Sequence, residues 1–111
     1  MHNSEIPLVA ATRLLNKSKS TFIELLKHGS LSVELYKPRK VDNQQPHDRD
    51  EVYVIASGMG TFFNGARRVK VKKADFLFVA AGVEHRFEKF TADFSTWVFF
   101  YGPVGGEVSN V

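Results

Sequence analysis

Cysteine is absent from this 111-residue chain. Disulfides, thiolate metal sites and thiol nucleophiles are therefore excluded. Long apolar runs are also lacking, so no stretch is long enough to span a bilayer. The first residues, "MHNSEIPLVAATRLL", lack the basic segment and apolar run of a secretory signal. We therefore expect a cytoplasmic protein.

Positive charge is in small excess. The chain has 15 basic and 12 acidic residues, so its net charge is only +3 although its pI is about 9.3. Nucleic-acid binding requires basic residues gathered on one face. The densest basic run, "RRVKVKK" at 67–73, alternates valine with lysine, which is typical of a half-buried strand with a solvated face. We expect neither a nucleic-acid partner nor a membrane partner.

Composition predicts a single domain. Apolar residues make up 43% and charged residues 24%, as in a soluble globular protein. A chain of this length forms one domain of ordinary size. The ten phenylalanines indicate an aromatic-packed barrel or an apolar pocket. We expect residues 1–111 to form one domain with its core at about 22–102, a flexible N-terminal segment and a loose tail from Val104.

Beyond residue 21 the pattern is one of short strands. Leu31, Val33 and Leu35 alternate with polar residues, which predicts that they share one face of a strand. The dipeptide Asn64-Gly65 predicts a tight hairpin turn with positive φ at both residues. No segment after residue 21 has a convincing helical period. Seven or eight strands are expected, which is typical of a sandwich or barrel. The other strand-like runs are 21–26, 51–57, 75–81 and 95–101.

A histidine and a carboxylate lie close together in "QPHDRDEVYVIASGMG", residues 45–60. Gln45 and His47 are two residues apart and would share a face on a strand. His47 and Glu51 would be about 13 Å apart in a fully extended chain. Aspartates, which are turn formers, lie between them. We infer a bend that returns Glu51 to His47, with Tyr53 on the same face as Glu51.

A distant segment, "AAGVEHRFEK", offers a second histidine. His85 follows the turn signal at Gly82 and would share a strand face with Phe87. Two histidines and a carboxylate form the facial set of non-haem Fe(II) sites, and they also suit Mn, Zn, Ni or Co. The alternative is that His47 and His85 are ordinary core or surface residues, and spacing alone favours neither interpretation.

The order of these residues resembles the cupin superfamily, whose members are small jelly-roll β-barrels. The first cupin motif, G-x5-H-x-H-x3-4-E-x6-G, is matched by Gln45, His47, Glu51 and Gly58. The second, G-x5-P-x-G-x2-H-x3-N, is matched in spacing by Ala74, Ala80, Gly82, His85 and Lys89. Gln45 stands in the place of a motif histidine, and Ala74, Ala80 and Lys89 stand in the places of glycine, proline and asparagine.

The resemblance implies an all-β, single-domain jelly-roll barrel holding a divalent metal ion (Fe, Mn, Zn or Ni). It implies His47, Glu51 and His85 as ligands, with Gln45 as a fourth ligand or as a partner of metal-bound water.

Two functions follow from the resemblance. One is a metalloenzyme, of dioxygenase or isomerase type, acting on a small organic molecule with Tyr53 donating a hydrogen bond or a proton. The alternative is a non-catalytic module that binds or senses a sugar or other small molecule. A barrel without metal is disfavoured because buried ionisable ligands are costly without an ion. A homodimer is also implied. The candidates for the pocket wall, which could equally be plain core, are Phe62, Phe78, Phe87 and Trp97.

Overall fold

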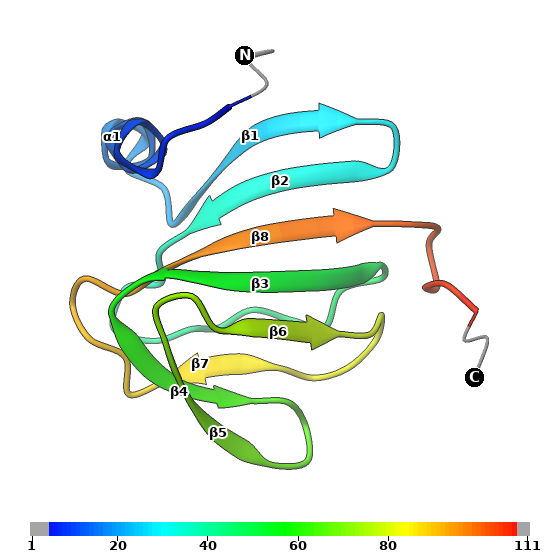
Figure 1. Cartoon of the computed structure of the whole chain (residues 1–111). Helices are drawn as coiled ribbons and strands as arrows, with labels where there is room; N and C mark the ends of the chain where they lie inside the picture. Colours follow the sequence, from blue (N-terminus) through cyan, green and yellow to red (C-terminus); the bar gives the residue numbers. More distant parts are fainter. Residues whose placement is uncertain (1–4, 109–111) are drawn as a thin grey trace.

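The computed structural model describes residues 5–108, which contain one helix and eight strands (Figure 1). The helix is α1 (Leu8–Ser18). The strands are β1 (Phe22–His28), β2 (Leu31–Tyr36), β3 (Asp50–Ser57), β4 (Met59–Phe63), β5 (Arg68–Lys72), β6 (Phe76–Val79), β7 (Arg86–Glu88) and β8 (Ser95–Tyr101). The prediction of an all-β domain with short strands beyond residue 21 is confirmed.

The strands form two antiparallel sheets that enclose a common core. The larger sheet has the order β1-β2-β8-β3-β6 and the smaller has the order β5-β4-β7. The sheets form an open rather than a closed barrel (Figure 1). Aromatic and branched side chains from both sheets fill the space between them, as is usual for barrel interiors. This cluster comprises Tyr53, Ile55, Phe62, Val71, Val79, Phe87, Phe94 and Val98.

The flexible N-terminal segment predicted from the sequence contains a helix instead. Residues 8–18 form α1, which begins directly after Pro7 and ends at Lys19 in the left-handed region. Its buried face, which includes Ala11 and Leu15, packs on the outer side of the large sheet. Within residues 5–108 there is no helix long and apolar enough to cross a membrane.

Strand β2 alternates as predicted, but its polar face is the one that looks inward. Leu35 is fully buried in the cluster beneath α1, outside the barrel. Glu34 and Tyr36, on the opposite face, line a cavity formed by the inner face of the large sheet and the loop that contains residues 41–47. The helix therefore allows the interior face of this strand to be polar, because it supplies the burial that the apolar face needs.

The β4–β5 turn differs from the predicted tight hairpin. Its loop spans residues 64–67, and Gly65 has a φ of 87° whereas Asn64 is not in the left-handed region. The Asn64 side-chain oxygen instead accepts hydrogen bonds from the N–H groups of Ala66 and Arg67. This use of an asparagine side chain to close a turn on its own backbone replaces the second positive φ.

The C-terminal segment is tied down as far as Glu107. The N–H of Gly105 donates to the Asp48 carbonyl at 2.6 Å, and the N–H of Glu107 donates to the Asp50 carboxylate at 2.8 Å. The Glu107 and Ala81 N–H groups hold the pKa of Asp50 below its usual value. The predicted loose tail thus does not apply to these residues, and its last part, residues 109–111, lies outside the described residues.

Two of the motif departures fall at strained backbone positions. Ala74 has a φ of 77° and Lys89 a φ of 49°, in the left-handed region that favours glycine or asparagine.

We expect Ala74→Gly to raise the free energy of unfolding by about 1 kcal/mol, since relief of the side-chain clash exceeds the extra chain entropy. Thermal denaturation measures this. The control is Ala80→Gly, at an exposed position without positive φ, which should destabilise the protein. Equal losses from both variants would contradict the prediction.

Candidate metal centre

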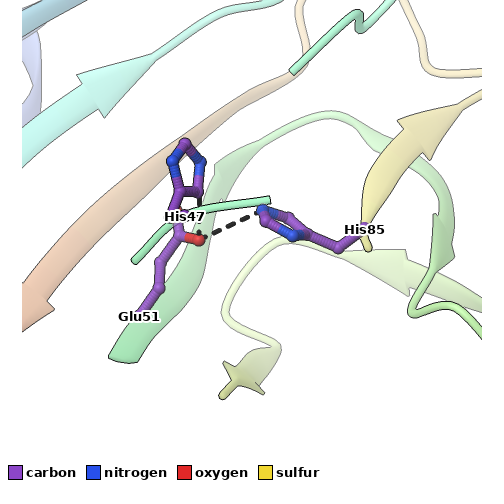
Figure 2. Close-up of side chains that lie close together, drawn as sticks. All are labelled: His47, Glu51 and His85. Carbon is purple, nitrogen blue, oxygen red and sulfur yellow. Dashed lines mark ion pairs between the residues drawn. The ribbon is translucent and has the colours of Figure 1, made fainter. Parts of the chain in front are cut away.

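His47, Glu51 and His85 converge at one end of the space between the sheets (Figure 2). Their candidate ligand atoms all lie within 4.8 Å of one another. Glu51 Oε1 is 3.1 Å from His85 Nε2 and 3.9 Å from His47 Nε2. Segments almost forty residues apart in the sequence therefore meet at a site of the size of one ion's coordination sphere.

The backbone between His47 and Glu51 brings these side chains together. The chain bends at residues 48–49, as inferred from the aspartates, and β3 then carries Glu51 on its inward face beside Tyr53. The N–H of Gly82, whose φ is 82°, donates to the His47 carbonyl at 2.7 Å. That bond links the turn before His85 to the loop carrying His47, so the two halves of the site are held together by main chain.

The hydrogen bonds of His85 define its tautomer. Its Nδ1 lies 2.8 Å from the Val83 carbonyl, which can only accept, so Nδ1 carries a hydrogen. In the neutral ring Nε2 then has a free lone pair, which is directed at Gln44 Oε1 at 3.1 Å, while Glu51 Oε1 lies 3.1 Å from Nε2 outside hydrogen-bonding geometry. Glu51 is 1% exposed, and its Oε1 accepts no hydrogen bond from the described residues. Two buried acceptors facing each other need a proton or a cation between them.

The surrounding charges agree with this arrangement. Burial opposes ionisation of His85, but Glu51 and the Val83 carbonyl outweigh it and raise the pKa of the imidazole above its usual value. Burial, followed by the Glu51 carboxylate, raises the pKa of Tyr53 well above the ordinary range. Tyr53 therefore keeps its hydrogen, and its hydroxyl donates to Gln44 Oε1 at 3.0 Å.

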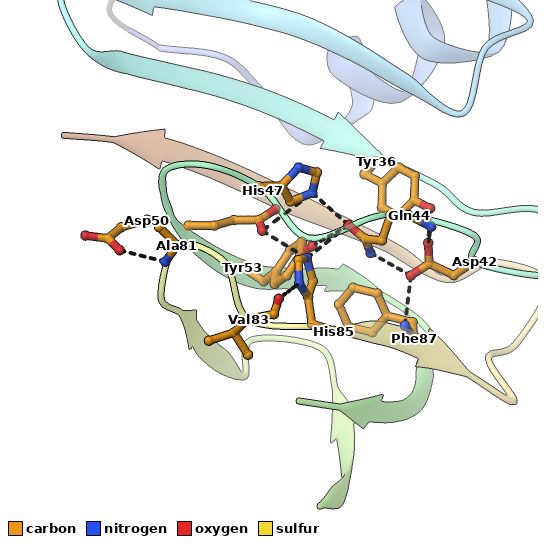
Figure 3. Close-up of polar contacts among 11 residues, drawn as sticks. Tyr36, Asp42, Gln44, His47, Asp50, Tyr53, Ala81, Val83, His85 and Phe87 are labelled. Carbon is orange, nitrogen blue, oxygen red and sulfur yellow. Dashed lines mark hydrogen bonds and ion pairs between the residues drawn. The ribbon is translucent and has the colours of Figure 1, made fainter. Parts of the chain in front are cut away.

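Gln44 rather than Gln45 lies in this cluster. Gln45 is exposed and lines a surface hollow to which Gln44 and His85 also contribute. Gln44 Oε1 lies 3.1 Å from Nε2 of both histidines (Figure 3). Residues 42–47 form a loop and not a strand, so the same-face relation assumed for Gln45 and His47 does not hold there.

A cavity of about 570 Å³ opens beside the cluster. His47, whose side chain is 33% exposed, and the edge of Glu51 form part of its wall. None of the four aromatics predicted to form this wall lies there: Phe62 and Phe87 belong to the core, Trp97 packs in the cluster beneath α1, and Phe78 is 52% exposed. The remaining lining residues are Thr21, Phe22, Glu34, Tyr36, Val41, Asn43, Gln44, Tyr53, Val98 and Phe100.

Comparison with known proteins fits the fold and the motifs. No protein-family model matches the chain. The chain is 32% identical over 84 residues to an uncharacterized protein of Streptomyces coelicolor, covering 74% of this chain and 80% of that protein. A cupin-2 domain protein of Shewanella frigidimarina superposes with a TM-score of 0.68 at 16% identity, covering 87% of this chain and 94% of that chain.

A DMSP lyase of Ruegeria pomeroyi superposes with a TM-score of 0.63 at 21% identity, covering 73% of this chain and 46% of that chain. The fold is thus that of a small cupin-type domain, as the two motifs predicted. Within that class, the chain belongs to the same family as the uncharacterized Streptomyces protein.

The cavity contains a carboxyl group with altered titration. Burial, then Glu24 and Glu51, raise the pKa of Glu34 to about 7. Ionising Glu34 above this pH therefore costs free energy in the folded chain but not in the unfolded chain, so stability falls as pH rises from about 4.5 to 7.

We expect metal-free Glu34→Gln to be more stable than the unsubstituted protein at pH 8, by about 1 kcal/mol after solvent screening. The difference should vanish toward pH 4.5, as followed by urea denaturation across this range. Glu5→Gln, at an exposed position, is the matched control. A constant difference at every pH would contradict the assignment.

Proposed function

We propose that this protein holds one divalent metal ion through His47, Glu51 and His85. The observation that carries the proposal is the buried Glu51 Oε1, which has no hydrogen-bond partner among the described residues although His85 Nε2 lies 3.1 Å away. Imidazole nitrogen and carboxylate oxygen are ligands that Fe, Mn, Zn and Ni accept. The residues present therefore fit such an ion. When bound, the metal supplies a Lewis acid that polarises an oxygen of the bound molecule.

The cavity beside the site supports a small organic molecule as the ligand. Its apolar wall, which includes Phe22, Val98 and Phe100, would exclude water from one side of the molecule. Glu34 offers a carboxyl group on β2, the strand that pairs with β8. Tyr53 would act as a hydrogen-bond donor that fixes the site, because its raised pKa keeps the hydroxyl protonated at neutral pH.

We propose an enzyme of dioxygenase or isomerase type. The partly exposed His47 leaves one side of the site open to the cavity, as catalytic metal sites require. The structural similarity to a DMSP lyase supports the proposal that this fold can carry an enzyme site. The reaction of that lyase is not proposed for this chain. The alternative, a binding or sensing module, differs in one measurable respect: it would bind the molecule and release it unchanged.

The proposed dimer has support in the exposed apolar residues of the large sheet. β1 is an edge strand of that sheet, and Phe22 at its start is 49% exposed. An unpaired edge is a template for pairing with a second chain. We further propose that the protein works in the cytoplasm and that it is a homodimer. Light scattering during gel filtration tests the dimer directly.

Metal content tests the site. We expect about one divalent ion per chain in the purified protein by elemental analysis, and loss of that ion in His85→Ala, because the variant removes a ligand nitrogen. His28→Ala, which removes an exposed histidine in β1, is the control and should retain the ion. Circular dichroism establishes that both variants are folded. Unchanged metal content in folded His85→Ala would refute the ligand assignment.

Turnover separates the two functional candidates. The metal-loaded protein is incubated with a panel of keto acids, diketones and sugar phosphates while oxygen uptake and isomer formation are followed. We expect turnover of a panel member that is lost in His85→Ala and kept in His28→Ala. Saturable binding of a panel member without any product would favour the binding module instead.

A further inference from the structure

We infer that Gln44 supplies a fourth protein ligand, its amide oxygen, and that Asp42 is the positioning residue that aims this oxygen into the site. This inference rests on the proposed metal site and goes beyond it by naming a ligand that the cupin motif places at Gln45. Asp42 and Gln44 lie in the loop before β3, outside both sheets.

The position of the Gln44 oxygen indicates a ligand. Oε1 lies 3.1 Å from His47 Nε2 and 3.1 Å from His85 Nε2, on the side of the histidines that faces the inside of the cluster (Figure 3). In the neutral tautomer of His85, Nε2 has no hydrogen to donate, so this approach again places two acceptors face to face. Gln44 Oε1 differs from Glu51 Oε1 in accepting a hydrogen bond from the Tyr53 hydroxyl, and it is the atom at which the His85 Nε2 lone pair is directed.

Asp42 determines which end of the amide enters the site. The Gln44 amide nitrogen donates to Asp42 Oδ2 at 2.6 Å, and the Gln44 backbone N–H donates to Oδ1 at 3.3 Å. A carboxylate can only accept, so the amide nitrogen is the atom that must face Asp42. The amide oxygen is consequently turned toward the two histidines.

Asp42 is itself held rigidly by the second half of the site. It is 3% exposed, and it accepts hydrogen bonds from the Phe87 N–H at 2.8 Å and from the Tyr36 hydroxyl at 2.5 Å. Phe87 lies on β7, which begins directly after His85, so one carboxylate joins the Gln44 loop to the strand that follows the histidine. Short bonds to a charged acceptor are the strong ones, which makes Asp42 suited to fixing the amide before a metal arrives.

The resulting ligand set has a definite character. Two imidazole nitrogens, one carboxylate oxygen and one amide oxygen carry a single negative charge, that of Glu51. Such a set suits divalent first-row metals rather than Cu(I), which prefers sulfur. It also predicts the direction of one change. Gln44→Ala removes the amide oxygen and should weaken metal binding.

The experiment is a double-mutant cycle on metal affinity. Mn²⁺ and Zn²⁺ binding are measured by calorimetry on chelator-stripped protein with Gln44→Ala, Asp42→Asn and the double variant. We expect Asp42→Asn to weaken binding about 10–100-fold, the usual range for partners that orient a ligand. An asparagine at position 42 can donate its own side-chain N–H to Gln44. The Gln44 amide can then rotate so that its oxygen faces position 42 and no longer faces the histidines. Gln45→Ala, at the exposed neighbouring position, is the matched control and should change nothing.

Coupling distinguishes positioning from a structural role. Asp42→Asn should cost metal affinity when Gln44 is present and nothing further when Gln44 is already alanine. Its cost to thermal stability, through Phe87 and Tyr36, should be the same in both backgrounds. Equal affinity losses in both backgrounds would show that Asp42 acts through the fold, which overturns the positioning role.

The remaining outcomes separate this inference from the proposed function. Gln44→Ala that binds metal as tightly as the unsubstituted protein overturns the fourth ligand and leaves His47, Glu51 and His85 standing. A stripped, unsubstituted protein that binds neither metal overturns both. Gln44→Met keeps the side-chain length without an oxygen, so it should also lose affinity for Mn²⁺, and this keeps the inference testable if Gln44→Ala is poorly folded.

Discussion

The site is built around a buried carboxylate oxygen that lacks a donor. Glu51 Oε1 has no hydrogen-bond partner among the described residues, and in the neutral ring of His85 the nearby Nε2 has no hydrogen, because Nδ1 donates to the Val83 carbonyl. Inside a protein such an arrangement is unfavourable unless positive charge is placed between the groups. A proton or a metal cation placed between these groups would therefore stabilise the site.

Main-chain hydrogen bonds and one buried carboxylate fix the positions of the side chains in the site. The Gly82 N–H bond to the His47 carbonyl joins the two motif segments on one side of the site. Asp42 joins the loop of Gln44 to β7 on the other side. Because both links tie the first half of the site to the second, side chains distant in sequence keep their separation without depending on the ion.

Sequence patterns predicted the regular strands and the motif spacing, and they missed features that have no strong periodic pattern. Alternation located the strands, and the histidine and glutamate spacing located three of the converging side chains. α1 was missed although Leu8, Ala11 and Leu15 follow a helical spacing, because its apolar stripe is short and its exposed face is mixed. β2 was recognised, but alternation alone could not show that its apolar face lies outward beneath the helix.

Gln44 and Asp42 could not have been selected from the sequence. Periodicity relates residues only within regular elements, and residues 42–47 form a loop whose course is set by its partners. The motif spacing favoured Gln45 because that position is counted from His47, yet the chain presents the neighbouring glutamine instead. A loop position acquires its direction from tertiary hydrogen bonds, here those of Asp42, and these are visible only once β7 is in place.

The two apolar cores lie apart from the proposed metal ligands. One cluster fills the barrel behind the site and a second lies beneath α1, and neither includes His47, Glu51 or Gln44. In the metal-free state a proton on His85 can satisfy Glu51, since that carboxylate and the Val83 carbonyl raise the pKa of the ring despite its burial. That proton stabilises the folded state at pH values below the ring's raised pKa and is lost above it. A metal bound at the proposed site would therefore compete with this proton for one lone pair, and its binding would be an equilibrium separate from the apolar contacts of the two cores.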